Sequence, residues 1–218
     1  MKKLLTLTSV LFTPALLIGQ SGLDPSDILK PLKEQWTSYS GDMTGKRYSA
    51  LKLIDRNNVK NLSLKWVNSN ITTGCGPTGT APMDAGGFGG GRGGGRGIPA
   101  APAPIIVGGL GNGDANNCGP ARLGGGILFV DGIIYASSPD NVWAIDSRDG
   151  TVLWHYYWKT RGGTSLQTRG LGMWHNYIYF ELHDDWVVCL DAKTGKEVWK
   201  KEISSFDQQY FSSNAPMV

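Results

Sequence analysis

The chain has 218 residues, a net charge of +3, and charged residues at 18% of its positions. Its lysines and arginines are scattered along the sequence instead of forming a stripe or cluster, so the charge pattern gives no support for nucleic-acid binding, and we expect no nucleic-acid partner. The length fits one large domain or two small ones.

The first 22 residues have the pattern of a secretory signal peptide. Lys2 and Lys3 precede an apolar run over residues 4–18, and small or polar residues follow it. The run is shorter than the roughly 20 residues of a membrane-spanning helix. No cysteine follows it directly, which argues against a lipoprotein anchor. We therefore expect a signal peptide over 1–22 and a periplasmic or secreted mature protein.

Residues 23–70 are predicted to form an irregular N-terminal segment that ends in a strand. Turn-forming pairs occur at Gly41-Asp42 and Thr44-Gly45. The strand is predicted over 62–67 and carries Trp66.

Residues 71–126 are dominated by glycine, and 20 of the 31 glycines in the chain lie between Gly74 and Gly126. Such a tract buries too little apolar surface to offset the entropy lost when it becomes ordered. We therefore predict a flexible surface insertion. Two alternatives stay open for Cys75 and Cys118: a disulfide that closes this loop, or two unpaired thiols. Cys189 lies in a predicted strand and is expected to be a small core residue.

From residue 127 onward, the sequence repeats short apolar strands separated by turn residues. The pattern Asp-x-x-x-Gly-x-x-x-Trp occurs at 146–154 and again, 45 residues later, at 191–199. A strand-rich repeat of roughly 40 to 50 residues is typical of a β-propeller with one blade per repeat. The predicted strands cover 127–130, 133–137, 142–145, 152–157, 171–174, 177–182, 186–190 and 197–203.

The predicted fold is thus all-β, a partial β-propeller of four-stranded antiparallel blades with about two blades plus edges. The first blade is assigned to 127–160, the second to 161–205, and the start of a third to 206–218, with an opening strand over 214–218. Trp66 precedes Trp154 by 88 residues, close to two repeat lengths, so the strand over 62–67 is assigned to the closing blade. Propellers have at least four blades, and this chain is predicted to form about two. We therefore expect it to be the N-terminal fragment of a larger protein.

The repeated residues have structural roles. The aspartate can accept hydrogen bonds from backbone amides of the turn, and the glycine permits a positive φ. We expect Trp66, Trp154 and Trp199 to pack between neighbouring blades and not to form a cofactor site.

The repeat is similar to the tryptophan-docking motif of the eight-bladed quinoprotein dehydrogenases, which use pyrroloquinoline quinone (PQQ). The stretch from Trp36 to Ser49, with Asn58-Val59 and Asn61-Leu62, resembles the start of their catalytic domain. The resemblance covers most of 36–70 and 123–218. It implies an exported enzyme that oxidises an alcohol or sugar hydroxyl and passes the electrons to cytochrome c or a membrane quinone.

Three residues fall at positions where this resemblance implies contact with the cofactor. Arg169, followed by Gly170, matches an arginine that binds PQQ, and a guanidinium offers a bidentate fork to a carboxylate. Its alternative is a surface arginine before a strand. Ser213 matches a hydroxyl that hydrogen-bonds the cofactor, and its alternative is a strand cap. Thr164 lies where alcohol-oxidising members carry two adjacent cysteines; here the residues are Gly-Thr-Ser, so that disulfide is absent.

The sequence also departs from the family pattern at 124–126, where three glycines replace an expected glutamate. Both departures fit a sugar- or polyol-oxidising or a divergent member better than the methanol-oxidising branch. The resemblance places the Ca²⁺ or lanthanide ligands and the catalytic aspartate beyond Val218. No catalytic residue is therefore predicted within this chain, and as an isolated fragment it is expected to be inactive.

Two other functions are considered. One is a non-enzymatic propeller scaffold of the cell envelope, similar to outer-membrane assembly factors with the same repeat; the other is a small exported binding module. The run His183-Asp184-Asp185 resembles a metal site, but a turn between two strands explains it more simply. Glu181 alternates with apolar residues and is expected on a blade face.

Overall fold

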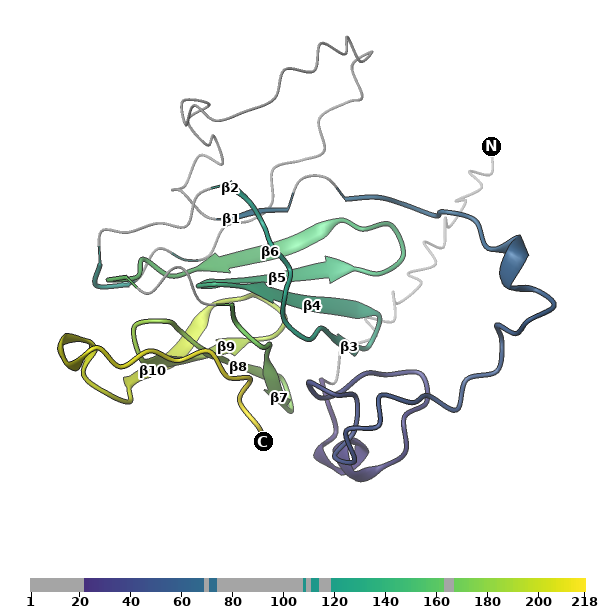
Figure 1. Cartoon of the computed structure of the whole chain (residues 1–218), viewed down its shortest axis with the longest axis horizontal. Helices are drawn as coiled ribbons and strands as arrows, with labels where there is room; N and C mark the ends of the chain where they lie inside the picture. Colours follow the sequence, from purple (N-terminus) through teal and green to yellow (C-terminus); the bar gives the residue numbers. More distant parts are fainter. Residues whose placement is uncertain (1–21, 69–70, 74–107, 109–110, 114–118, 163–166) are drawn as a thin grey trace, which may run out of the picture.

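A computed structural model of the protein describes residues 22–68, 71–73, 108, 111–113, 119–162 and 167–218. Two antiparallel four-stranded sheets follow one another along the chain, each with its strands side by side in sequence order (Figure 1). The first contains β3 (Leu128–Val130), β4 (Ile133–Ser138), β5 (Asn141–Asp146) and β6 (Val152–Tyr157). The second contains β7 (Gly172–Trp174), β8 (Tyr177–Glu181), β9 (Trp186–Asp191) and β10 (Glu197–Glu202). The predicted all-β class and the two four-stranded blades are confirmed.

The outer turns, between β5 and β6 and between β9 and β10, are built alike. The Oδ1 atoms of Asp146 and Asp191 each accept a hydrogen bond from a backbone amide within the turn, at an N···O distance of 2.9 Å. Gly150 and Gly195 have φ values of 79° and 68°, and each amide donates to the carbonyl of its aspartate at 2.8 Å. The predicted roles of the repeated aspartate and glycine are therefore confirmed.

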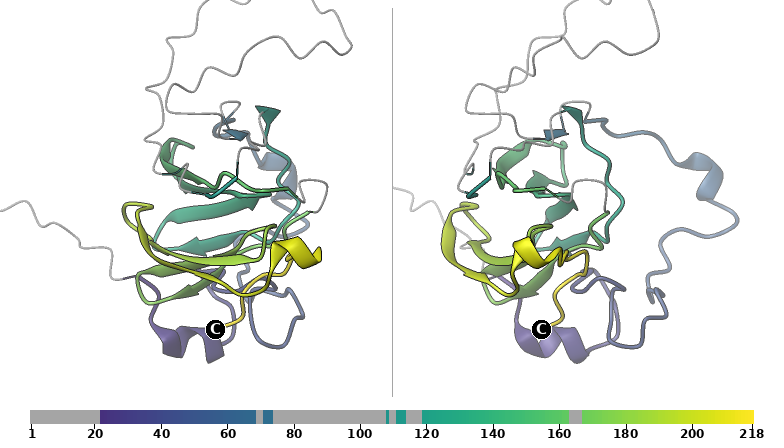
Figure 2. Two further views of the ribbon diagram at one scale, coloured as in Figure 1. Left: turned by 90° about the vertical axis from the view of Figure 1, so that its left-hand side faces the viewer. Right: turned by 60° about the vertical axis from the view of Figure 1, so that its left-hand side comes forward.

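The core lies between the two sheets, which are stacked face to face (Figure 2). Removing these apolar side chains from water is the main force that holds one blade on the other. Strand β5 is buried along its whole length because Trp66, Ile71 and Ala121 cover its other face. The core between the blades is formed mainly by Leu128, Val130, Tyr135, Val142, Trp154, Met173, Ile178, Phe180, Val188 and Leu190.

Two of the repeated tryptophans dock on the blade that follows them through equivalent hydrogen bonds. Trp154 Nε1 donates to the carbonyl of Ala192 at 3.0 Å, and Trp66 Nε1 donates to the carbonyl of Ser147 at 2.9 Å. Ser147 and Ala192 each follow the aspartate of their repeat. Trp66 therefore docks on the first blade as Trp154 docks on the second, which confirms their structural role. Trp199 is 43% exposed, so its packing between neighbouring blades stays a prediction.

The strands expected over 62–67 and 214–218 are wrong, because neither segment forms a β-ladder in the structure. A strand needs a neighbour with which it exchanges successive backbone hydrogen bonds. Segment 62–67 is instead held by side chains: besides Trp66, Asn68 Nδ2 donates to the carbonyl of Gly150 at 2.6 Å. The described residues also form three short 3₁₀ helices: η1 (Pro25–Leu29), η2 (Val59–Asn61) and η3 (Phe206–Gln208).

The two ends of the glycine-rich segment lie side by side. Strand β1 (Thr72–Thr73) pairs with β2 (Gly119–Pro120) in antiparallel register. Cys75 and Cys118 lie outside the described residues, as do residues 1–21 of the predicted signal peptide. Cys189 is a buried free thiol in β9, in agreement with its predicted place in the core. Within the described residues, no helix is long and apolar enough to cross a bilayer.

Replacing Gly150 by alanine should destabilise the first blade more than replacing Gly132. The two glycines have φ values of 79° and 78°, so the backbone strain is similar. A Cβ atom on Gly150 would lie 2.5 Å from Cε3 of Trp66, whereas one on Gly132 would meet no atom within 4 Å. Denaturant unfolding should show a loss of about 1 kcal/mol for Gly132→Ala and about 2–4 kcal/mol for Gly150→Ala. Equal losses would contradict the packing of Trp66 on this turn.

Candidate functional site

Successive repeats bring their first residues together at one edge of the two sheets. The amide of Gly126, just before β3, donates to the carbonyl of Arg169 at 2.7 Å. The amide of Arg169, just before β7, donates in turn to the carbonyl of Ser213 at 3.0 Å. These residues are spaced by 43 and 44 positions, close to the length of one repeat. The repeat therefore places Arg169 and Ser213 side by side, as neighbouring blades require.

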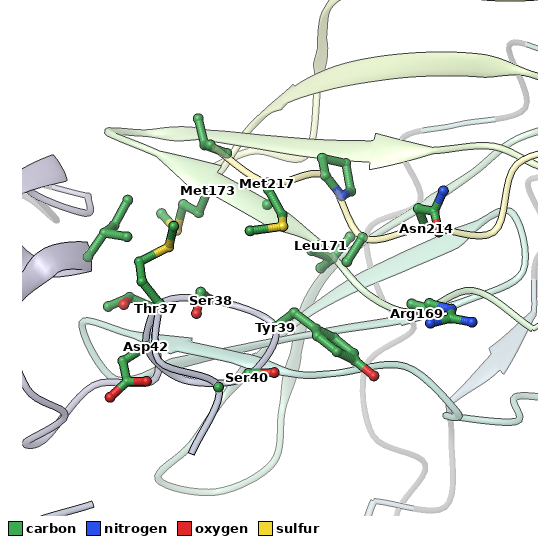
Figure 3. Close-up of a pocket in the computed structure, with 17 residues that line it drawn as sticks. Thr37, Ser38, Tyr39, Ser40, Asp42, Arg169, Leu171, Met173, Asn214 and Met217 are labelled. Atoms are coloured by element: carbon green, nitrogen blue, oxygen red, sulfur yellow. The ribbon is translucent and has the colours of Figure 1, made fainter. Parts of the chain in front are cut away.

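A cavity of about 550 Å³ lies beside this line of residues (Figure 3). Its walls come from the N-terminal segment 37–45, the start of β7, and the segment 214–218. In Figure 3, Arg169 and Asn214 lie at one end, Met173 lies toward the other, and the Tyr39 ring stands between them. The volume falls within the range of small-molecule and cofactor sites, and an apolar wall with a few polar groups is typical of them.

Arg169 supplies an available positive charge to this cavity. Its side chain is exposed and makes no hydrogen bond or ion pair with the described residues. Gly170 follows with φ 138°, and a Cβ atom there would lie 2.9 Å from the carbonyl oxygen of Gly126. A glycine is therefore needed directly after Arg169 for the close approach of two backbones. Asp42, the other charged residue of the lining, already accepts a hydrogen bond from Thr44 Oγ1 at 2.7 Å.

The other two predicted cofactor contacts are placed differently. Ser213 is partly buried next to Arg169, but the residues that line the cavity include its neighbour Asn214 and not Ser213 itself. Thr164 lies outside the described residues. The roles of these three residues toward a cofactor stay predictions, and the geometry favours Arg169.

A second cavity, of about 440 Å³, lies on the side of Tyr39 that faces the glycines at 124–126. The guanidinium carbon of Arg47 lies 5.4 Å from the centre of the Tyr39 ring. A Cβ atom on Gly126 would lie 2.6 Å from Cδ2 of Tyr39. Tyr39 thus occupies the space beside Gly126, and a larger residue there would require the ring to move.

His183, Asp184 and Asp185 form the tight turn between β8 and β9, which confirms the turn interpretation. All three are buried, and Asp185 has the positive φ of 62° that such a turn requires. Asp184 accepts hydrogen bonds from Trp158 Nε1 at 2.9 Å and from the amide of Arg161 at 3.0 Å. Its carboxylate therefore serves the packing of the blade.

Asp140 and His183 form a buried pair between the two blades. The amide of His183 donates to Asp140 Oδ1 at 3.1 Å, and the Nδ1 and Oδ2 atoms lie 3.8 Å apart. Burial raises the pKa of Asp140 to about 7 and lowers the pKa of His183 to about 4. Between these values both groups are mainly uncharged, so the pair is a hydrogen-bonded contact more than an ion pair.

Replacing Asp140 by asparagine should make the protein progressively more stable than the wild type as pH rises from 4 to 8. The folded wild type keeps a proton on Asp140 up to a pKa of about 7, whereas the unfolded chain releases it near the ordinary value of 3.8. The wild type therefore loses stability across this window, and the amide, which does not ionise, loses none. The difference in unfolding free energy should grow by more than about 1.4 kcal/mol, the equivalent of one pKa unit. A difference that does not change with pH would contradict a raised pKa.

The sequence did not identify most of the cavity wall. Tyr39 lies within the stretch from Trp36 to Ser49 that resembles the start of the quinoprotein catalytic domain, and that resemblance is the available signal for it. Met173, Asn214 and Met217 carry no motif, because their place in the wall depends on how three distant segments meet.

A sequence model of a protein family described as "Outer membrane protein assembly factor BamB" matches residues 115–212. This range contains all eight strands of the two sheets. The match therefore describes the repeat and its blades.

Two curated relatives are dehydrogenases. Quinohemoprotein alcohol dehydrogenase ADH IIB of Pseudomonas putida is 28% identical over 191 residues, which are 84% of this chain and 21% of that protein. The 1-butanol dehydrogenase (quinone) of Thauera butanivorans is 35% identical over 97 residues, which are 42% of this chain and 16% of that protein. The chain thus spans about a fifth of the length of the curated relatives it matches.

The structure also resembles a solved member of the same group. The crystal structure of quinohemoprotein alcohol dehydrogenase from Comamonas testosteroni matches with a TM-score of 0.51 and 25% identity. The match covers 84% of this chain and 21% of that one. Sequence and fold therefore point to the same group of proteins.

Proposed function

Because the chain belongs to the family of PQQ-dependent quinoprotein dehydrogenases and forms part of their β-propeller, we propose that the full-length protein oxidises a hydroxyl group with bound PQQ. An alcohol is the first candidate substrate, since the curated relatives are named as alcohol dehydrogenases, and a sugar is the second. The observation that carries the proposal is the guanidinium of Arg169, which has no partner among the described residues and stands at a cavity of about 550 Å³.

The residues of this cavity fit a rigid, planar cofactor with three carboxylates. Arg169 would bind a carboxylate or a quinone oxygen through its planar fork of donors. The Asn214 side chain would add a neutral hydrogen bond, and Tyr39, Leu171 and Met217 would cover the ring system and exclude water. When bound, PQQ supplies the acceptor for the hydride that leaves the carbinol carbon.

The remaining chemical groups are proposed to lie outside the described residues. These residues contain no group of three or more His, Cys, Asp or Glu side chains that could hold a metal ion. We therefore place the ligands of a Ca²⁺ or lanthanide ion, and the base that takes the hydroxyl proton, elsewhere in the full-length protein. The metal would polarise the quinone of the cofactor.

Export and electron transfer are proposed from the sequence and from the relatives' names. The pattern over 1–22 supports a periplasmic or secreted protein. The words "quinohemoprotein" and "quinone" in those names support cytochrome c or a membrane quinone as the electron acceptor.

A second candidate function is a scaffold of the cell envelope without a cofactor. It is favoured by the description of the family model that matches residues 115–212, an outer-membrane assembly factor. The repeat by itself suits both functions, since the roles of its repeated residues are structural. The available Arg169 at the cavity gives preference to the enzyme.

Reconstitution of the full-length protein distinguishes the two functions. The protein is loaded with PQQ and with Ca²⁺ or a lanthanide, and reduction of an artificial electron acceptor is followed with a panel of alcohols and sugars. The enzyme is expected to show PQQ-dependent turnover, fastest with an alcohol. Absence of PQQ binding under all loading conditions would favour the scaffold.

A further inference from the structure

The second blade holds the segment that forms one wall of the cavity at three successive residues. Ser212 Oγ donates to Asp185 Oδ1 at 2.8 Å, and the carbonyl of Ser213 accepts from the amide of Arg169 at 3.0 Å. The backbone of Asn214 then donates to the carboxylate of Glu181. The residues that follow line the cavity, so these three contacts fix where the wall begins.

Asp185 is the most buried of these anchoring groups. Asp185 is 2% exposed. Its carboxylate accepts the hydrogen bond from Ser212 and a longer one from Ser204 Oγ, at 3.5 Å. A carboxylate out of contact with water must be satisfied by hydrogen bonds, and bonds to an ionised acceptor are stronger than neutral ones. The hydrogen bond to Asp185 therefore holds Ser212 firmly in place.

The wall also lies tightly against β7. A Cβ atom on Gly172 would lie 2.6 Å from the carbonyl oxygen of Pro216 and 3.0 Å from Cγ2 of Val218. Small displacements of the segment therefore change the space between Met217 and Met173, which both line the cavity. Along the chain, Asn214 therefore lies between Ser212, which is bonded to Asp185, and Pro216, which packs against Gly172.

We propose that Asp185, acting through Ser212, is a positioning residue for the cavity that holds Asn214, Pro216 and Met217 in place for a bound ligand. The identity of that ligand as PQQ rests on the proposed function. Asp185 itself does not line the cavity, and its effect is transmitted through the segment it anchors.

The outer turn of the same blade offers a matched control. Thr194 Oγ1 donates to Asp191 Oδ1 at 2.8 Å, the same kind of bond at the same distance as Ser212 to Asp185. Neither Thr194 nor Asp191 lines the cavity. Ser212→Ala and Thr194→Ala therefore each delete one hydroxyl-to-aspartate bond, the first partly buried at the cavity wall and the second exposed and away from it.

The test measures two properties of the full-length protein: amide hydrogen exchange over residues 213–217 without cofactor, and the Kd for PQQ. Ser212→Ala should accelerate exchange in this segment and weaken PQQ binding about tenfold, the loss of one bond to a charged group. Thr194→Ala should change both by less than about twofold, because the bond that it deletes is exposed and neither of the two bonded residues lines the cavity. Ser212→Thr, which keeps the hydroxyl, should restore both.

Unchanged exchange and unchanged Kd in Ser212→Ala would overturn the proposal, as would equal effects of Ser212→Ala and Thr194→Ala. If exchange rises in Ser212→Ala while the wild type binds no PQQ, the anchoring by Asp185 is supported and the proposed function is wrong. If the wild type binds PQQ and the variant binds it equally well, the proposed function stands and Asp185 does not position the site.

Discussion

Replacement of Arg169 by alanine is expected to weaken the binding of PQQ by about 10- to 100-fold, the worth of a charge-assisted hydrogen bond to a carboxylate. The guanidinium has no competing partner among the described residues, so its full donor capacity is available to a ligand. The fold should be little affected, because the contacts that Arg169 makes to Gly126 and Ser213 use its backbone. Equilibrium titration of the cofactor-free protein with PQQ measures the effect.

Two variants control this experiment. Arg169→Lys keeps the charge but loses the planar fork, so an intermediate loss of affinity is expected. Arg148→Ala removes an arginine from the outer turn of the first blade, where the side chain is 83% exposed and pairs with Asp146 at 2.6 Å. It should leave PQQ affinity unchanged. If Arg148→Ala and Arg169→Ala weaken binding equally, the effect is one of overall charge and not of the cavity.

Replacement of Trp154 by alanine is expected to lower the free energy of unfolding by about 3–5 kcal/mol, as for other large aromatic residues in a core. Trp154 is 2% exposed, packs beside the ring of Tyr135 and donates to the carbonyl of Ala192 on the next blade. Its loss would leave a cavity between the blades, and the carbonyl of Ala192 would lose the shorter of its two side-chain hydrogen bonds, the other being the one from the Tyr135 hydroxyl at 3.4 Å. Denaturant unfolding of the full-length protein measures the change.

The matched variant is Trp199→Ala, at the same position of the second repeat. This ring is 43% exposed in the structure, so the described contacts predict a loss well below that for Trp154. The loss of stability for Trp154→Phe should fall between those for Trp154→Ala and Trp199→Ala, since phenylalanine keeps most of the apolar contact but cannot donate the hydrogen bond. A small effect of Trp154→Ala would contradict its role as the link between the blades. A loss for Trp199→Ala as large as that for Trp154→Ala would indicate that further residues cover Trp199.

The fold was predictable because the same turn-forming residues occur in both repeats. Asp146 and Gly150 recur as Asp191 and Gly195, and each pair closes a turn whose hydrogen bonds are local. Local turn chemistry and the apolar strands between the turns are visible in one sequence. The docking of Trp66 followed from the spacing of the repeat alone, although the strand expected around it did not form.

The site was less predictable because its wall depends on contacts between distant segments. Arg169 could be found from its resemblance to a family position, whereas Tyr39 and Met217 meet only through the packing of three segments. The sequence suggested a turn at Asp185 but not the bond to Ser212, 27 residues away, since no periodicity encodes a contact between a buried carboxylate and a later loop. The prediction of a strand over 62–67 was wrong for the same reason. A strand requires a pairing partner, which the local sequence does not specify.

A crystal structure of the full-length protein loaded with PQQ tests the binding of the cofactor most directly. We predict that PQQ lies in the cavity between Tyr39 and the segment 214–217, with a carboxylate or quinone oxygen about 3 Å from the guanidinium of Arg169. PQQ bound elsewhere with Arg169 facing solvent, or an empty cavity at saturating PQQ, would contradict this assignment.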